Sequence, residues 1–146
     1  MSILKLTDTL YISPQLTEAD AETAARLGIK SVICNRPDAE QPDQPDFARV
    51  SQWLAAQNIT QAAHQPVTAP AINAADVAEF QRLLSELPAP VLAYCRTGTR
   101  SSLLWGFHQV QNGMTTAEVK TAAAKAGVDL TQFEERLNQA AANGLA

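Results

Sequence analysis

The chain has 146 residues and a mass of 15.7 kDa, which is enough for one domain with a buried core. Hydrophobic residues make up 46% and charged residues 18%, so the composition is that of a folded globular protein rather than a disordered one. The 11 basic and 15 acidic residues give a net charge of −4. This balance argues against a general nucleic-acid binder, because such binding draws on an excess of Lys and Arg.

The sequence carries no apolar run near 18 residues, so we expect no membrane-spanning helix. Residues 1–14 do not read as a signal peptide, because they contain no continuous apolar stretch. Cys34 and Cys95 lie far apart, and two cysteines do not make a disulfide framework. We therefore expect a cytoplasmic protein that binds neither membranes nor nucleic acids. Its oligomeric state is left open.

Strand and helix patterns alternate along the chain. Short apolar or β-branched runs predict strands at residues 3–6, 10–13, 29–35, 59–67 and 91–94. Apolar residues at helical spacing and capping residues predict helices at residues 17–27, 46–57, 73–87, 101–112, 115–126 and 131–143. The first and last of these begin with capping-box patterns, Thr17 with Asp20 and Thr131 with Glu134. Residues 1–146 thus predict a single α/β domain, a mostly parallel central sheet of about four or five strands with helices on both faces.

The most informative segment joins the last expected strand to the following helix. The connecting loop consists of Arg96, Thr97, Gly98 and Thr99. Ligands bind at the carboxyl ends of the strands in an open α/β sheet, so we expect Cys95 there, facing the N-terminus of the next helix. The loop N–H groups can then form a cradle for a tetrahedral anion, and the helix dipole together with Arg100 favours a thiolate at Cys95.

Three further residues of this segment suit an anion site. Gly98 permits a positive φ, and Arg100 can hold two anion oxygens in a bidentate fork that Lys could not make. Ser101 can donate a hydrogen bond to the sulfur and help it to leave in a second step. A cysteine near an arginine is by itself more often an ordinary core thiol. The ordered series of strand, Cys, Gly-containing turn, Arg, hydroxyl and helix is what favours a reactive site.

Two segments of the chain resemble a known family. CRTGTRS (Cys95 to Ser101), together with LYISPQLTEADAETAARLGIKSVICNRPD (Leu10 to Asp38), resembles the bacterial beta-lactamase hydrolase-like, phosphatase-like family, which is related to the dual-specificity cysteine phosphatases. The resemblance covers roughly residues 3–113 and leaves the helices of residues 114–146 without an assigned role.

The resemblance implies a protein or phosphomonoester phosphatase whose substrate is a phosphorylated protein or small molecule. It implies Cys95 as the nucleophile that forms a phospho-cysteine, Arg100 as the phosphate-binding residue, and Ser101 as the hydroxyl that follows this arginine. No cluster of His and Cys has metal-ligand spacing, so we expect neither a metal nor another cofactor.

The loop departs from the phosphatase pattern in two ways. Tyr94 precedes Cys95 where dual-specificity phosphatases usually have His, and four rather than five residues separate Cys95 from Arg100. A tyrosine in that position and a loop of this length also occur in rhodanese-type sulfurtransferases, which carry sulfur as a Cys persulfide. A sulfurtransferase and a weakly active phosphate-binding module therefore remain alternatives.

The general acid is also missing from its usual place, where this chain has Thr68. Asp38 and His64 are the candidates to replace it, since both are expected near the same edge of the sheet. Arg36 and Arg96 are candidates to bind a second anionic group at the rim. Each residue also has an ordinary interpretation: Asp38 as a turn former, His64 as a structural histidine, and the two arginines as solvated charges.

Overall fold

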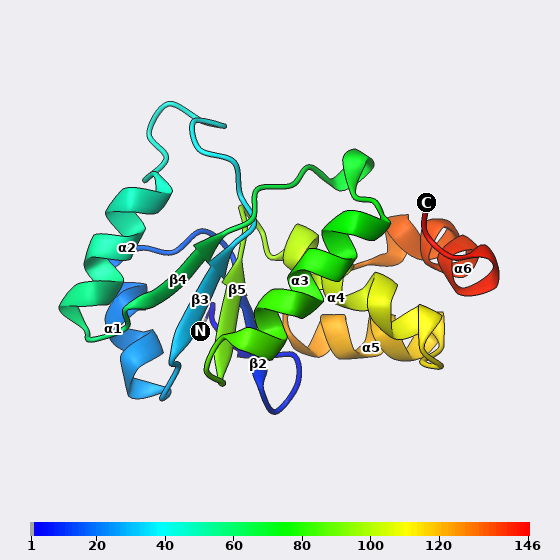
Figure 1. The fold of residues 1–146 in the computed structure, drawn as a ribbon, viewed down its shortest axis with the longest axis horizontal. Coiled ribbons are helices and arrows are strands. Elements are labelled where there is room, and N and C mark those ends of the chain that lie inside the picture. Colours follow the sequence, from blue (N-terminus) through cyan, green and yellow to red (C-terminus); the bar gives the residue numbers. More distant parts are fainter. Residues whose placement is uncertain (1) are drawn as a thin grey trace.

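The computed structural model describes residues 2–146, and within them the chain forms one five-stranded sheet with six α-helices (Figure 1). The strands are β1 (Leu4–Lys5), β2 (Leu10–Ser13), β3 (Ser31–Cys34), β4 (Gln61–His64) and β5 (Val91–Tyr94). The helices are α1 (Glu18–Arg26), α2 (Phe47–Ala56), α3 (Ala74–Glu86), α4 (Thr99–Gln111), α5 (Thr116–Lys125) and α6 (Glu134–Asn143). Two short 3₁₀ turns are η1 (Ala69–Ala71) and η2 (Thr131–Phe133).

The sheet has the strand order β1-β2-β5-β3-β4, and only β1 runs antiparallel to its neighbour. β5 lies at the centre, and all four of its residues are buried, as a strand covered on both faces requires. Tyr94 is in register with Ser13 of β2 and with Cys34 of β3, so these three strands end together. The predicted mostly parallel sheet of four or five strands is confirmed.

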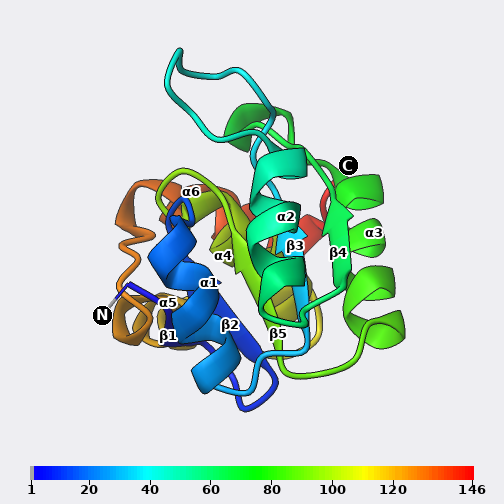
Figure 2. The ribbon, with the colours of Figure 1, turned by 90° about the vertical axis from the view of Figure 1, so that its left-hand side faces the viewer.

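Helices cover both faces of the sheet, as predicted. Figure 1 shows α1 and α2 on one side and α3 to α6 on the other, and Figure 2 views the molecule from the α1 and α2 side. Successive side chains of β5 point to opposite faces of the sheet and so belong to two cores. Leu92 and Tyr94 pack with α1 and α2, whereas Val91 and Ala93 pack in the core on the other face. None of the helices in residues 2–146 combines the length and the apolar character needed to span a membrane.

The two C-terminal helices, which the sequence left without a role, pack on α4. Val119 of α5 and Leu137 of α6 are fully buried in the same core as α3 and α4. Gly106 allows this approach, because a Cβ at that position would lie only 2.9 Å from Val119 Cγ1. The close fit makes residues 116–143 an integral cover for the helix that follows the cysteine loop.

Two predicted helix starts differ from the structure. α4 begins at Thr99 rather than Ser101, because Gly98 adopts a left-handed N-cap conformation, and Arg100 therefore lies in the first helical turn. The capping box predicted for Thr131 and Glu134 is wrong. The Asp129 carboxylate accepts the Thr131 N–H at 2.9 Å, residues 131–133 form η2, and α6 begins one turn later without a side-chain cap.

Candidate active site

Cys95 follows β5 directly and is completely buried at the carboxyl edge of the sheet. The Gly98 N–H donates a hydrogen bond to Cys95 Sγ at 3.1 Å, so the loop turns back over the sulfur. The N-terminus of α4 begins at the next residue, which directs the positive end of its dipole toward the same place. The loop amide and the helix terminus therefore both direct positive partial charge toward the sulfur.

Gly98 sets the path of the loop. Its φ of +89° lies in the left-handed region, which confirms the expectation of a positive φ. A Cβ at this position would lie 3.0 Å from Ile12 Cγ2 and 3.2 Å from Val128 Cγ2. The loop is therefore braced by β2 on one side and by the segment after α5 on the other, and a side chain here would press on both while holding a strained positive φ.

Arg100 lies beside Cys95, with its side chain 13% exposed. Its Nη1 donates to Glu40 Oε2 at 2.8 Å and to the Val67 carbonyl at 3.0 Å, and its Nη2 donates to Glu40 Oε1 at 2.9 Å. Burial works against the charge of this guanidinium. The hydrogen bonds to Glu40 and the adjacent Cys95 outweigh that effect and raise the pKa of Arg100, which stays a cation.

Glu40 is a site residue that the sequence analysis missed. Its carboxylate accepts both of these Arg100 bonds and a third, from Arg36 Nε to Oε1 at 2.9 Å. The hydrogen bonds from Arg100 hold the pKa of Glu40 below its usual range, with Arg36 contributing and burial opposing. The only sequence signal was an acid two residues after Asp38, in a proline-rich loop where a solvated charge is the ordinary interpretation.

Arg36 and Arg96, the two expected rim arginines, lie in different surroundings. The Arg36 side chain is 3% exposed, and its Nη1 and Nη2 donate to Gln15 and Gln41, so its donors hold the loop around Glu40. Arg96 is exposed, while its carbonyl accepts the Gln15 N–H at 3.2 Å. Of these two arginines, Arg96 is the one whose side chain is exposed to solvent, in the loop that follows Cys95.

The hydroxyl groups around the loop are engaged with one another or with the sheet. Ser101 Oγ donates to Asn35 Oδ1 at 2.7 Å, rather than to the sulfur as the sequence suggested. Thr97 Oγ1 donates to Thr99 Oγ1 at 2.9 Å, which fixes the exposed side of the turn. Asn35, at the end of β3, is a second residue that the sequence analysis did not single out.

The two candidate acids lie at the base of the loop between β3 and α2. Asp38 Oδ1 accepts the Phe47 N–H at 2.9 Å, which fixes the start of α2. His64 Nε2 lies 2.8 Å from the Arg36 carbonyl oxygen, and its ring stacks on Phe47 with 4.7 Å between centroids. In this conformation both side chains hold the loop that carries Glu40.

The second cysteine differs from Cys95 in its environment. Burial raises the pKa of the Cys34 thiol, and its sulfur donates to the Arg36 carbonyl at 3.4 Å. Burial likewise raises the pKa of Tyr94, whose side chain packs with Cys34 in the core beneath α1 and α2. Cys34 is therefore a neutral, structural thiol.

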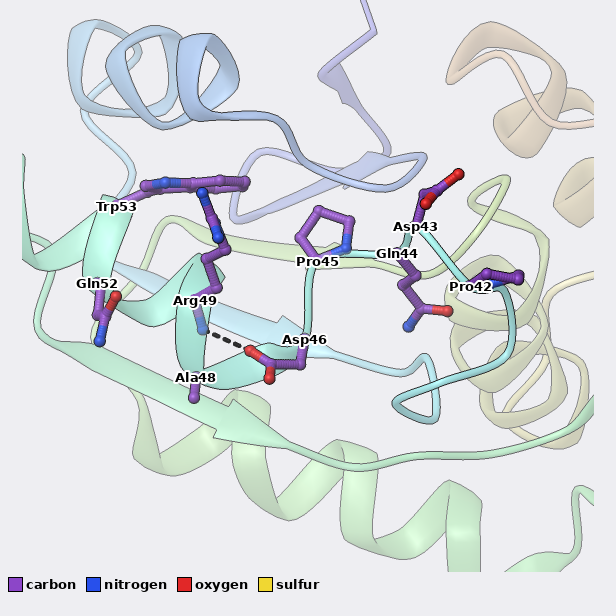
Figure 3. Close-up of a pocket in the computed structure, with 9 residues that line it drawn as sticks. All are labelled: Pro42, Asp43, Gln44, Pro45, Asp46, Ala48, Arg49, Gln52 and Trp53. Carbon is purple, nitrogen blue, oxygen red and sulfur yellow. Dashed lines mark hydrogen bonds between the residues drawn. The ribbon is translucent and has the colours of Figure 1, made fainter.

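An open hollow of about 620 Å³ lies along the loop of residues 42–46 and α2 (Figure 3). The Arg49 guanidinium lies over Trp53 there, 5.7 Å from the ring centroid, and the Arg49 backbone N–H donates to Asp46 Oδ1. Neither Cys95 nor Arg100 lines this hollow, so it is separate from the cysteine loop. Across residues 2–146, no group of three or more His, Cys, Asp or Glu side chains is placed to hold a metal ion.

The fold is that of the cysteine phosphatases. TpbA of Pseudomonas aeruginosa, in a crystal structure with pTyr, matches with a TM-score of 0.61 at 20% identity, over 98% of this chain and 91% of that one. The chain belongs to the phosphatase-like domain family of the beta-lactamase hydrolase-like proteins, whose family model matches residues 2–112.

Two relatives support this membership. The crystal structure of nma1982 from Neisseria meningitidis, a phosphatase candidate, matches with a TM-score of 0.94 at 56% identity, over 96% of this chain and 99% of that one. The beta-lactamase hydrolase-like protein of Agrobacterium fabrum is 30% identical over 96% of this chain. That match spans only 33% of the Agrobacterium protein, so the chain corresponds to about a third of it.

Proposed function

We propose that the chain is a cysteine phosphatase of dual-specificity-like type that hydrolyses phosphate monoesters without a metal and acts in the cytoplasm. One observation carries the proposal: the Gly98 N–H points at Cys95 Sγ from the turn that leads into α4, with Arg100 alongside. A sulfur so placed faces N–H donors and a guanidinium that suit a phosphoryl group. The family membership supports the same reaction class.

In the first step the Cys95 thiolate attacks phosphorus in line with the leaving group. An S–P bond forms, the P–O bond to the leaving group breaks, and the departing oxygen takes a proton from solvent water. The amides of the Arg96–Thr99 loop and the Arg100 guanidinium receive the charge on the three equatorial oxygens. In the second step water attacks the phospho-cysteine, the S–P bond breaks, and phosphate leaves with the thiolate restored.

The leaving group decides how fast the first step can be. Asp38 and His64 both make contacts that hold the loop after β3, so neither is free to protonate the leaving group in this conformation. A general acid typically raises the rate by about 10²–10⁴, and this contribution is then missing. Aryl phosphates, whose leaving groups need little protonation, should therefore react faster than alkyl phosphates. The pTyr bound by TpbA supports an aryl phosphate as the first substrate to test.

The Arg100 guanidinium and the loop amides supply the positive charge that a metal ion provides in other phosphatases. Burial lowers the pKa of Arg100, but Glu40 and Cys95 together outweigh this effect and raise it, so the guanidinium is a cation near neutral pH. Activity should therefore survive treatment with EDTA.

A sulfurtransferase is the second candidate, and one observation favours it: only four residues separate Cys95 from Arg100, a loop length that also occurs in rhodanese-type sulfurtransferases. In that reaction Cys95 Sγ attacks the outer sulfur of thiosulfate. A Cys95 persulfide forms, the S–S bond of thiosulfate breaks, and sulfite leaves. Cyanide then takes the outer sulfur as thiocyanate, which restores the thiolate.

One assay series separates the candidates. Wild-type protein, Cys95→Ser and Cys34→Ser are given p-nitrophenyl phosphate, with and without EDTA, and in parallel thiosulfate plus cyanide. Phosphate release by wild type and Cys34→Ser that is lost in Cys95→Ser supports the phosphatase. Thiocyanate formation with the same dependence supports the sulfurtransferase. Binding of phosphate without turnover in either assay would reduce the site to a phosphate-recognition module.

A further inference from the structure

The hydrogen bonds of Arg100 to Glu40 and Val67 leave one edge of its guanidinium without an oxygen acceptor. Arginine has five N–H donors, and three of those on Arg100 are taken by the protein, two by Glu40 and one by the Val67 carbonyl. The two that remain are the Nε–H and one Nη2–H. These two donors point the same way from one edge of the planar group, which is the geometry that binds two oxyanion oxygens.

Cys95 approaches Arg100 from a different loop than Glu40 and Val67 do. Glu40 and Val67 approach Arg100 from the loops after β3 and β4, whereas the sulfur belongs to the loop after β5. Cys95 is close enough to Arg100 to be one of the groups that raise the pKa of the guanidinium. Since Glu40 and Val67 take the other three donors, only the Nε–Nη2 edge is left for the sulfur and for an anion bound over it.

Glu40 is itself held in place. Its Oε1 accepts from Arg36 Nε as well as from Arg100 Nη2, so the carboxylate bridges two guanidinium groups. The other two nitrogens of Arg36 donate to Gln15 and Gln41, and its side chain is almost fully buried. The result is a fixed series in which Arg36 orients Glu40 and Glu40 orients Arg100.

We propose that Glu40 is the positioning residue of this site, which fixes the Nη1–Nη2 edge of Arg100 so that the Nε–Nη2 edge is presented to the oxyanion bound over Cys95. The inference rests on the proposed use of the loop as an oxyanion site, and it names a residue outside the cysteine loop as necessary for it. Glu40 acts through Arg100 and does not itself touch the substrate.

The arrangement depends on both the charge and the length of the side chain. Gln at position 40 keeps the shape, but its amide N–H₂ would face one of the Arg100 nitrogens, so one strong hydrogen bond is replaced by a donor–donor contact. Asp keeps the charge but is one methylene shorter, so it cannot reach both Arg36 and Arg100 at the observed distances. We therefore expect Glu40→Gln to impair the site strongly and Glu40→Asp to impair it less.

Two measurements test the proposal. The first is the protection of Cys95 from iodoacetamide by inorganic phosphate, which needs no turnover. The second is kcat/KM for p-nitrophenyl phosphate. Glu40→Gln should weaken phosphate protection and lower kcat/KM by about tenfold or more, equivalent to about 1.4 kcal/mol in each equilibrium or barrier. Glu86→Gln is the matched control, because it removes the same charge from an ion pair with Arg82 on the exposed side of α3.

A double-mutant cycle with Arg100→Ala separates positioning from a general structural effect. If Glu40 acts only through Arg100, adding Glu40→Gln to Arg100→Ala causes no further loss of kcat/KM. An additive loss, or phosphate protection in Glu40→Gln equal to that of wild type, overturns the proposal. Thermal unfolding of each variant identifies any that do not fold, and Glu40→Asp then supplies the comparison.

Phosphate protection and hydrolysis, measured separately, distinguish the failure of the role proposed for Glu40 from the failure of the proposed function. In one outcome, wild-type protein shows no Cys95-dependent hydrolysis, but phosphate protects Cys95 and Glu40→Gln abolishes that protection. The phosphatase assignment then fails and the role of Glu40 stands. If wild type hydrolyses the substrate and Glu40→Gln behaves like Glu86→Gln, the assignment stands and the role of Glu40 is refuted. If phosphate protects neither protein, Glu40 does not serve an oxyanion site.

Discussion

Ser101 Oγ donates a 2.7 Å hydrogen bond to Asn35 Oδ1, and both side chains are completely buried where α4 meets the end of β3. Asn35 Nδ2 donates in turn to the Gln65 carbonyl at 3.1 Å. One amide thus ties the first turn of α4 to the ends of two parallel strands. The position of Arg100, one residue before Ser101, depends on this buried connection.

Ser101→Ala should lower the free energy of unfolding by about 1–3 kcal/mol, because it leaves Asn35 Oδ1 buried without its donor. Urea denaturation followed by fluorescence measures the change. Ser85→Ala is the control, since Ser85 makes its hydrogen bond to the Arg82 carbonyl on an exposed helix surface and should cost much less. Equal stability of the two variants would contradict the structural role assigned to Ser101.

Gly98→Ala should destabilise the protein more than Gly28→Ala. Both glycines have a positive φ, at +89° and +79°, so both variants carry backbone strain of order 1–3 kcal/mol. Only at position 98 would the new methyl also overlap side chains, those of Ile12 and Val128. The comparison of unfolding midpoints isolates this overlap. A Gly98→Ala protein as stable as Gly28→Ala would show that the loop can move away from β2.

Arg136 is expected to fix the turn that precedes α3. Its Nη1 and Nη2 donate to the carbonyls of Ala69 and Ile72, and its guanidinium stacks on Phe107 at 5.0 Å. Arg136→Ala should cost about 2 kcal/mol, since it removes two charge-assisted hydrogen bonds and the stacking contact, and Arg136→Lys should restore only part.

Arg82→Ala is the matched control for Arg136. Arg82 pairs with Glu79 and Glu86, but its side chain is 51% exposed, so its loss should cost no more than about 1 kcal/mol. Chemical denaturation of the four proteins provides the measurement. If Arg136→Lys matches wild type, a single charge suffices and the forked geometry has no role.

The Glu40 carboxylate should make stability depend on pH in the acid range. Its hydrogen bonds from Arg100 lower its pKa in the folded protein, so its contribution is complete above the ordinary glutamate pKa and is lost as pH falls through the lowered value. The stability difference between wild type and Glu40→Gln should therefore be constant near neutrality and shrink in acid. Denaturation curves at several pH values test this, and a difference that grows on acidification would contradict the assigned ion pairs.

The sheet and the position of the cysteine loop could be predicted because their signals are local. VLAY at residues 91–94 is a wholly apolar run that follows a proline turn, and the structure begins and ends β5 at those residues. The order of Cys95, Gly98 and Arg100 likewise placed the loop at the carboxyl edge of the sheet. These inferences needed only chain order, residue type and the behaviour of parallel strands.

The partners of the loop residues could not be predicted in the same way. Glu40 lies sixty positions from Arg100, and Asn35 lies sixty-six from Ser101, so each contact exists only after the strands have assembled. The loop after β3 has no hydrophobic periodicity that would reveal which of its charges turns inward. The brace of Val128 on Gly98 was hidden for the same reason, since it comes from the segment that follows α5.

Competitive alkylation of the native protein tests the central claim most directly. Wild-type protein is treated with iodoacetamide at pH 6, with and without inorganic phosphate, and the labelled cysteine is identified by mass spectrometry. We predict rapid labelling of Cys95, slowed by phosphate, while Cys34 stays unlabelled because burial raises its pKa. Labelling of Cys34 first, or labelling of Cys95 that is slow at pH 6 and indifferent to phosphate, would contradict an ionised sulfur in an oxyanion site.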